Sequence, residues 1–268
     1  VPQNFVLRRF TLCHNIADEP EAVIRMLRAV CSSAVPLSRL AVRHLCLAAR
    51  DVGDLLAAVL ASKQLEEVCV DLNPALGDEG FFALANGLAA DLPRLVRLSF
   101  VGCGVTGAAL TKLPGVLNRY KRPRALCLRG NDLGSKGGPA KIAALLAACT
   151  PLESLDVRGC GLGKSGALAV VQALPECTTL RRLGVADNGA GDKAAAKLAE
   201  LVAAGTCYIS AVDLSDNKVG KKPFVALLGA LTSPSARLTS LTIADTELPK
   251  AAAGDPLTDL ARSHVAHL

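Results

Sequence analysis

The strongest constraint on the fold is a pattern of apolar residues that returns about every 29 positions. Residues 152–162 give its form, L-x-x-L-x-L-x-x-N/C-x-L, in which Cys160 takes the N/C position. Nine copies can be placed, and their first residues are Leu7, Val42, Leu65, Leu95, Pro123, Leu152, Leu180, Ile209 and Leu238. A unit this short cannot bury its own apolar face, so successive copies must stack into one elongated core.

The spacing of the copies is regular over most of the chain and irregular at its beginning. From residue 95 onward the first positions lie 28 or 29 residues apart, whereas the first two steps are 35 and 23 residues. We therefore expect an insertion around residues 32–36 and a truncated second repeat. One solenoid is expected to occupy residues 1–268, with residues 251–268 as a candidate C-terminal capping segment.

Each copy predicts a strand, a turn and a helix. Alternating apolar residues predict a half-buried strand, and the Asn or Cys that follows predicts a turn in which its side chain bonds to backbone groups. The second half of the copy has helical spacing, as at Ile142, Leu145 and Leu146. Glycines between the halves, such as Gly134 and Gly163, favour a tight or left-handed backbone.

The resulting expectation is an α/β solenoid, curved as a right-handed horseshoe arc. Parallel strands should line its concave face, and helices should cover its convex face. The strands are expected to begin near residues 9, 44, 67, 97, 125, 154, 182, 211 and 240.

The composition agrees with closely stacked coils and argues against a membrane-spanning or secreted protein. Hydrophobic residues make up 51% of the chain but aromatic residues only 3%. No apolar run approaches the roughly 18 residues that a membrane-spanning helix needs. The chain begins at Val1 without a basic stretch followed by an apolar one. We therefore expect no signal peptide and interpret the chain as an excised segment of a longer protein.

The ten cysteines are explained by the repeat rather than by disulfides or zinc. The sequence contains no C-x-x-C pair and no N-x-S/T sequon, which favours reduced thiols in the cytoplasm. Cys103 and Cys160 occupy the turn position. Cys46, Cys69 and Cys127 are expected to point from the concave face and to react first.

Nothing in the sequence predicts catalysis, a metal site or a cofactor. The histidines are few and lie near the two ends of the chain, at His14, His44, His264 and His267. No H-E-x-x-H or G-x-S-x-G motif is present, and the glycine-rich stretch 134–138 lacks the G-K-[ST] ending of a phosphate-binding loop. The net charge of +6 comes without the interleaved aromatic residues of a nucleic-acid-binding surface. The basic run 119–124 can be a solvated loop or a docking patch.

The helical second half, the 28/29 spacing and the Asn/Cys exchange at Asn131, Cys160 and Asn188 resemble ribonuclease-inhibitor-like leucine-rich repeats. Residues 208–219, and the loop 134–139, are also similar to repeats of the CARMIL family of actin-capping-protein regulators. These resemblances imply a non-catalytic protein-interaction scaffold within a larger intracellular adaptor, with a cytoskeletal role in the CARMIL case. The alternative is a GTPase-binding or GTPase-activating protein of the Ran-activator type, although the acidic tail of that family is missing. The absence of Trp and the presence of only two Tyr argue against ribonuclease inhibition.

The concave face is the expected binding site, although the convex face remains an alternative. Basic residues gather there at Arg97, Arg129, Arg158 and Arg182. The other charged or titratable positions expected on the face are His44, Glu67, Asp71, Asp156 and Asp213, and an acidic column follows the strands at Asp187, Asp216 and Asp245. We expect a protein partner with an acidic or mixed-charge surface, and neither nucleic acid nor a membrane.

The four arginines allow two interpretations. Because parallel strands lie about 4.8 Å apart, their guanidinium groups could form one ladder that an acidic partner neutralises. Alternatively, Asp156 and Asp187 neutralise the arginines as local surface pairs. The oligomeric state is left open by the sequence.

Overall fold

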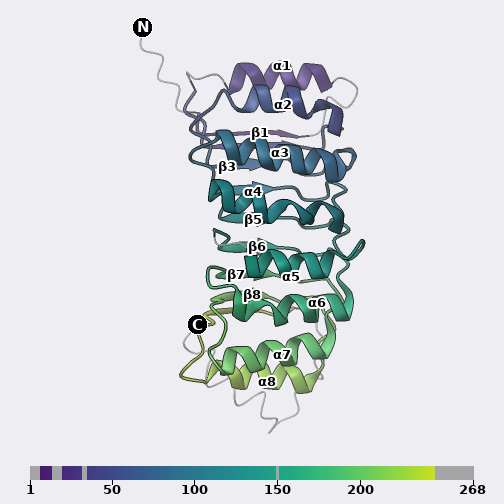
Figure 1. Ribbon diagram of the computed structural model, residues 1–268, viewed down its shortest axis with the longest axis vertical. Helices are drawn as coiled ribbons and strands as arrows, with labels where there is room; N and C mark the ends of the chain where they lie inside the picture. The colour runs from purple at the N-terminus through teal and green to yellow at the C-terminus, as the bar shows by residue number, and fades with distance from the viewer. Residues whose placement is uncertain (1–6, 14–19, 32–34, 149–150, 245–268) are drawn as a thin grey trace.

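The computed structural model describes residues 7–13, 20–31, 35–148 and 151–244, which form an elongated stack of coils (Figure 1). The strands of this part are β1 Arg9–Cys13, β2 Arg39–Arg43, β3 Glu67–Cys69, β4 Arg97–Ser99, β5 Ala125–Cys127, β6 Ser154–Asp156, β7 Arg182–Gly184, β8 Ala211–Asp213 and β9 Ser240–Thr242. Its α-helices are α1 Pro20–Val30, α2 Val52–Val59, α3 Gly77–Asp91, α4 Leu113–Tyr120, α5 Gly138–Ala148, α6 Gly163–Gln172, α7 Gly191–Ala203 and α8 Lys221–Leu231. None of these helices is long and apolar enough to cross a bilayer.

The described strands form one parallel sheet whose order, β1 to β9, is the order of the chain. Each strand is joined to the next through a turn and a helical segment, and the helices lie on one side of the sheet (Figure 1). Arg97, Ala125, Ser154 and Arg182 are register partners across β4 to β7. The predicted solenoid with parallel strands and helices outside them is therefore confirmed.

The second repeat differs from our expectation. Its strand is Arg39–Arg43 and not a segment beginning at residue 44, because Leu40 pairs with Val68 of β3. The pattern therefore starts at Leu37, which lies 30 residues after Leu7 and 28 before Leu65. The expected insertion and truncation were both wrong, since the early repeats have nearly the regular length.

The core lies between the sheet and the helices. The central residues of neighbouring strands, such as Leu98, Leu126 and Leu155, are at most 2% exposed. Where aromatic side chains enter this core, Phe81 of α3 and Phe100 after β4 meet edge to face, with ring centroids 4.9 Å apart. Aliphatic side chains fill most of the remaining space, as expected for coils packed close together.

A ladder of buried asparagines joins successive turns. Asn131 Oδ1 accepts hydrogen bonds from the amides of Cys103 and Val105 at 2.9 and 3.0 Å, and its Nδ2 donates to the carbonyl oxygen of Phe100 at 2.7 Å. Equivalent bonds are made by Asn73, Asn188 and Asn217. Each asparagine thus supplies both an acceptor and a donor to backbone groups of the preceding coil, as the turn position predicted.

Cysteine at the same turn position fulfils half of this role. Cys103 Sγ donates to the carbonyl oxygen of Val70 at 2.8 Å, and Cys160 Sγ donates to that of Leu128 at 3.1 Å. A thiol is a weak donor and a poor acceptor, so it cannot replace the amide oxygen. Burial raises the pKa of both thiols to about 12. The two cysteines are therefore structural thiols.

Glycines allow the coils to approach closely at the start of the helices. A Cβ atom at Gly134 would collide with the carbonyl oxygen of Gly161 in the next coil. Gly163 has instead a left-handed backbone, with φ of +67°. The tight backbone predicted at these positions therefore has two distinct causes.

Candidate protein-binding face

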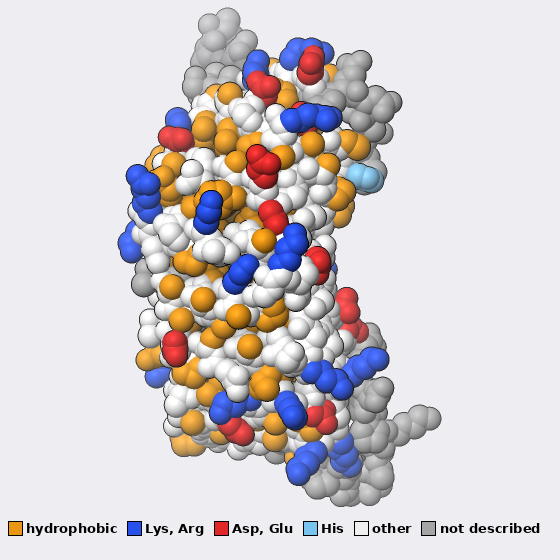
Figure 2. All heavy atoms as spheres, turned by 45° about the vertical axis from the view of Figure 1, so that its right-hand side comes forward, with side chains coloured by type: hydrophobic (Ala, Val, Ile, Leu, Met, Phe, Trp, Pro, Cys, Tyr) orange, Lys and Arg blue, Asp and Glu red, His pale blue; other side chains and the backbone are white. Residues whose placement is uncertain are grey.

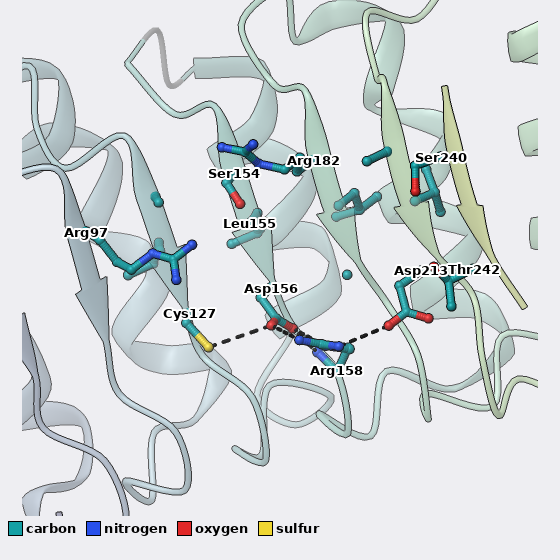
Figure 3. A pocket seen from close by; sticks show the side chains of 16 residues that line it. Arg97, Cys127, Ser154, Leu155, Asp156, Arg158, Arg182, Asp213, Ser240 and Thr242 are labelled. Carbon is teal, nitrogen blue, oxygen red and sulfur yellow. Dashed lines mark hydrogen bonds and ion pairs between the residues drawn. The ribbon is translucent and has the colours of Figure 1, made fainter. Parts of the chain in front are cut away.

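The outward side of the sheet is hollowed. We call this surface the sheet face. In each three-residue strand it comprises the first and third residues and also the residue two places after the third. In β1 and β2 it comprises the equivalent positions. Over β4 to β9 it contains an open depression of about 370 Å³ (Figure 3). Figure 2 shows a face of the molecule on which charges of both signs are scattered among apolar and uncharged side chains. We take the sheet face as the candidate binding site because this depression is lined by residues of the strands from β4 to β9.

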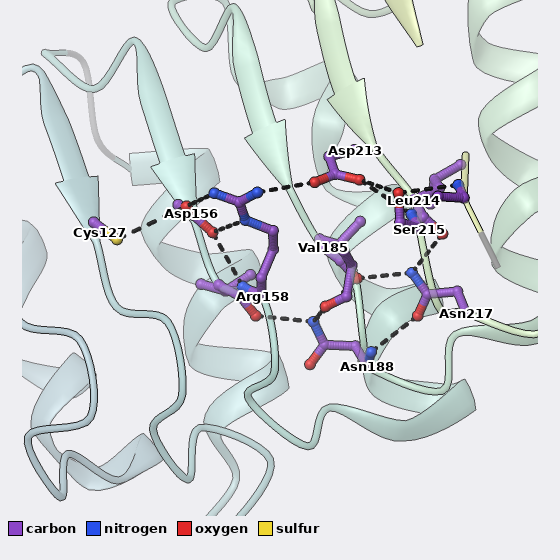
Figure 4. A network of polar contacts seen from close by, with 12 residues as sticks. Cys127, Asp156, Arg158, Val185, Asn188, Asp213, Leu214, Ser215 and Asn217 are labelled. Atoms are coloured by element: carbon purple, nitrogen blue, oxygen red, sulfur yellow. Dashed lines mark hydrogen bonds and ion pairs between the residues drawn. The ribbon is translucent and has the colours of Figure 1, made fainter. Parts of the chain in front are cut away.

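Arg158 is the centre of an ion-pair network on this face (Figure 4). Its Nε and Nη2 donate to the two carboxylate oxygens of Asp156 at 2.9 and 2.6 Å, and its Nη1 donates to Asp213 at 3.0 Å. Asp213 also accepts the hydroxyl of Ser215 at 2.8 Å. Since Asp156 belongs to β6 and Asp213 to β8, the arginine connects strands that are not direct neighbours.

The network shifts the ionisation of its members. The hydrogen bond to Asp156 raises the pKa of Arg158 above its ordinary value. Burial by itself would raise the pKa of Asp213, but the hydrogen bonds from Ser215 and Arg158 outweigh it and lower the pKa. Both groups are thus held in their charged forms, and the guanidinium group of Arg158 is occupied by carboxylates of the same chain.

A second network covers the sheet face at β2 to β4. Glu67 pairs with Arg39 at 3.4 Å and lies 3.9 Å from Arg97. The carboxylate of Asp71 is 3.2 Å from Arg43, and the Ser99 hydroxyl donates to it at 2.6 Å. The expected positions of Glu67 and Asp71 on this face agree with the structure.

Our sequence interpretation missed Arg39 and Arg43. It placed the second strand five residues too late and therefore assigned His44 to the concave face. The structure places His44 in the turn after β2, with φ of +54°, so that assignment was wrong. The signal that could have located the arginines is the pattern at Leu37, Leu40 and Val42, which restores the regular spacing.

The predicted single ladder of four arginines does not form. Arg97 and Arg182 are in the first row of the sheet face, separated by Ala125 and Ser154. Arg129 and Arg158 follow β5 and β6 by two residues and form part of another row. Asp156 neutralises Arg158 as the local-pair interpretation expected, but the second partner is Asp213 and not Asp187.

Several charges on the sheet face remain exposed. Arg97, Arg129 and Arg182 are exposed. The guanidinium groups of Arg129 and Arg182 make no hydrogen bond or ion pair with any residue that the structure describes. Arg129 shares a second depression, of about 400 Å³, with the exposed Asp187 and Asp216 at the end of the strands. Asp245 lies outside the described residues.

The expected accessible thiols are only partly accessible. Cys46 is exposed but belongs to the turn after β2 and not to a strand, and Cys127 is half-buried. Cys69 is only 2% exposed, and burial raises its pKa to about 11. The expected exposure of Cys69 was wrong, because the side chain is buried on the sheet face beside the second network. None of the nine described cysteines forms a disulfide.

Comparison with known proteins finds similarity to leucine-rich-repeat proteins. A family model described as "Leucine Rich repeat" matches residues 148–171. The chain is 30% identical to the ribonuclease inhibitor of Sus scrofa over 270 residues, which cover 90% of this chain and 58% of that protein. It is 29% identical over 171 residues to NACHT, LRR and PYD domains-containing protein 3 of Macaca mulatta, with 64% of this chain and 16% of that protein covered.

The fold has a counterpart among solved structures. The leucine-rich repeat-containing protein LegL7 of Legionella pneumophila matches with a TM-score of 0.53 and 14% identity, covering 97% of this chain and 98% of that chain. This likeness concerns the fold alone. The chain spans 58% or less of the length of the two curated relatives named above. Stacked repeats of this kind provide extended surfaces for binding proteins. The repeat pattern, the parallel sheet with its asparagine ladder and these relatives together show that the chain belongs to the leucine-rich-repeat proteins, with repeats of the ribonuclease-inhibitor-like class.

Proposed function

We propose that the chain is a non-catalytic scaffold that binds a partner protein through the sheet face. The observation that carries the proposal is the set of exposed charges around the two depressions, which are Arg97, Arg129, Arg182, Asp187 and Asp216. Exposed arginines around a hollow surface are suited to a mixed-charge partner. Other charges of the face are paired within the protein, as Arg158 is with Asp156 and Asp213.

Charge is expected to contribute more to this binding than aromatic anchors. The tyrosines lie away from the sheet face: Tyr120 ends α4, and Tyr208 precedes β8, where its ring contacts Arg181 and Arg237. Interfaces that rely on exposed ion pairs are weakened by salt. A complex formed on the sheet face should therefore dissociate as the salt concentration rises.

Two variants with tryptophan test the location of the binding site. Ala211→Trp places a large side chain on the sheet face at β8, and Gln172→Trp places it on an exposed position of α6. Proteins captured from a cell extract by the unmodified chain should be identified by mass spectrometry and then compared between the variants. Partners lost with Ala211→Trp but retained with Gln172→Trp support the proposal. Partners lost with Gln172→Trp but retained with Ala211→Trp would show that the binding site lies on the helix side.

The wider setting of the scaffold is part of the same proposal. We place it in the cytoplasm, as a segment of a larger adaptor. The similarity of residues 208–219 to CARMIL repeats supports a cytoskeletal version, in which the chain supplies scaffolding or localisation and cytoskeletal proteins are recovered with it. The alternative of a Ran-activator type predicts that the chain accelerates GTP hydrolysis by a captured GTPase. The porcine relative is a ribonuclease inhibitor, which suggests a third assay, inhibition of a ribonuclease, although the lack of tryptophan argues against this activity.

A further inference from the structure

We propose that Arg97 and Arg182 together form an anchor for a glutamate or aspartate side chain of the partner. The acidic side chain would lie over the short side chains of Ala125 and Ser154, between the two guanidinium groups. This inference rests on the proposed function and names the chemistry that the sheet face recognises. It concerns four residues in one row of the sheet.

The geometry brings the two arginines toward a common point. They are three strand steps apart, which corresponds to about 14 Å between their backbones at roughly 4.8 Å a step. In Figure 3 the Arg97 side chain extends toward β5 and that of Arg182 toward β6, so the two lean toward one another across the depression. Ala125 and Ser154 leave the space between them open, and the Ser154 side chain points into it (Figure 3). A carboxylate there can be reached by both arginines and by the serine hydroxyl.

The carboxylates around the row are bound more closely by other arginines. Asp156 and Asp213, the nearest carboxylates along β6 and β8, are both bonded to Arg158. Glu67 is 3.9 Å from Arg97, beyond hydrogen-bond distance, and it pairs more closely with Arg39. Two like charges directed at one point repel each other unless an anion arrives between them. A carboxylate from outside is therefore attracted to this position.

The occupant we assign is an acidic protein segment and not a free phosphate ion. Sites for free phosphate usually provide backbone amides at the beginning of a helix. Here the amides of Arg97, Ala125, Ser154 and Arg182 are all bonded to carbonyl oxygens of the preceding coil. The depression extends from β4 to β9, which is long enough for a peptide segment to lie across several strands. A guanidinium group can also bind a carboxylate through two parallel hydrogen bonds.

The experiment follows the Nε–H signals of the arginines by NMR in the intact chain labelled with ¹⁵N. The probe is a short peptide of alternating glutamate and glycine, and the matched peptide has glutamine in place of glutamate. Inorganic phosphate at the same ionic strength is the third titrant. The signals of Arg97 and Arg182 should move together and saturate with the glutamate peptide, and they should move little with the other two.

Variants that neutralise arginines on and off the sheet face separate the anchor from general attraction. Arg97→Gln combined with Arg182→Gln should weaken binding of the glutamate peptide at least tenfold. Arg181→Gln is the control, because Arg181 precedes β7 by one residue and its guanidinium contacts the ring of Tyr208. It should change affinity less than twofold. Circular dichroism should show all these variants folded, since the substituted side chains are exposed.

Three results would overturn the anchor. They are unchanged binding by the double variant, equal loss with Arg181→Gln, and saturation by phosphate in preference to the glutamate peptide. The proposed function has a separate readout, which is the loss of captured partners with Ala211→Trp. If that loss occurs while the glutamate peptide leaves Arg97 and Arg182 unaffected, the face binds a partner and the anchor is refuted. If partners are retained by Ala211→Trp, the proposed function itself fails.

Discussion

Replacing Asn131 by alanine tests what holds one coil to the next. The asparagine is 5% exposed, so water cannot easily replace its bonds. The change removes the acceptor of the Cys103 and Val105 amides and the donor to the carbonyl oxygen of Phe100. The carbonyl oxygen of Leu128 also loses the asparagine, but it keeps the thiol of Cys160. Three buried backbone groups are therefore left without this partner.

The expected loss of stability follows from that count. A buried polar group without a partner costs about 1–3 kcal/mol, and local relaxation reduces the sum. We expect Asn131→Ala to lower the free energy of unfolding by about 3–5 kcal/mol. Asn131→Cys is the matched control, because Cys103 and Cys160 occupy the same turn position. Its thiol can donate to Phe100 while the two amides remain without an acceptor, so we expect a loss of about 2–3 kcal/mol.

Urea unfolding followed by circular dichroism measures both values. Hydrogen exchange adds a local readout, since the amides of Cys103 and Val105 should lose protection in both variants. Equal destabilisation by alanine and cysteine would show that the thiol contributes nothing at this position. A loss below about 1 kcal/mol for Asn131→Ala would refute the reasoning that the ladder stabilises the stack.

Three further expectations follow from the same contacts. Cys160→Asn should raise the free energy of unfolding by about 1–2 kcal/mol, because the new amide oxygen offers an acceptor to the preceding turn; an unchanged urea midpoint contradicts this. The folded-state pKa of Asp213 is below its ordinary value of 3.8, so its contribution to stability is present above about pH 4 and is lost as the pH falls. Acid titration of the urea midpoint should therefore show a smaller decline for Asp213→Asn than for the unmodified chain, and parallel curves would speak against the network with Arg158. In native protein Ellman's reagent should modify Cys46 early and Cys69 only after unfolding, because Cys69 is 2% exposed; rapid modification of Cys69 would show that its cover opens.

The strand, turn and helix of the later repeats could be predicted because they depend on local patterns. Leu152, Leu155 and Val157 alternate as a half-buried strand requires, and a residue that can bond to the backbone follows at Cys160. The same pattern misled at the second repeat. Apolar residues at Leu37, Leu40 and Val42 and at Val42, Leu45 and Leu47 both fit it. The regular spacing of the repeats favours the first set, and the pairing of β2 with β3 establishes it.

The charged residues of the sheet face could be located from the sequence, but the partners with which they pair could not. Alternation along a strand places Arg158, Asp156 and Arg182 on the same side of the sheet. It does not tell which carboxylate each arginine meets, because Asp213 is 55 residues from Arg158 in the chain. An ion pair depends on distances of a few ångströms, and these are set by how the coils stack.

The sequence by itself determined the repeat, the parallel sheet, the buried asparagine positions and the side of the sheet on which the arginines lie. Tertiary structure decided the register of the second strand and the division of the arginines into committed and exposed groups. It also decided the orientation of Arg97 and Arg182 toward a common point. The physical reason is that the apolar period acts within one coil, whereas ion pairing and hollow surfaces arise between coils that are distant in the chain.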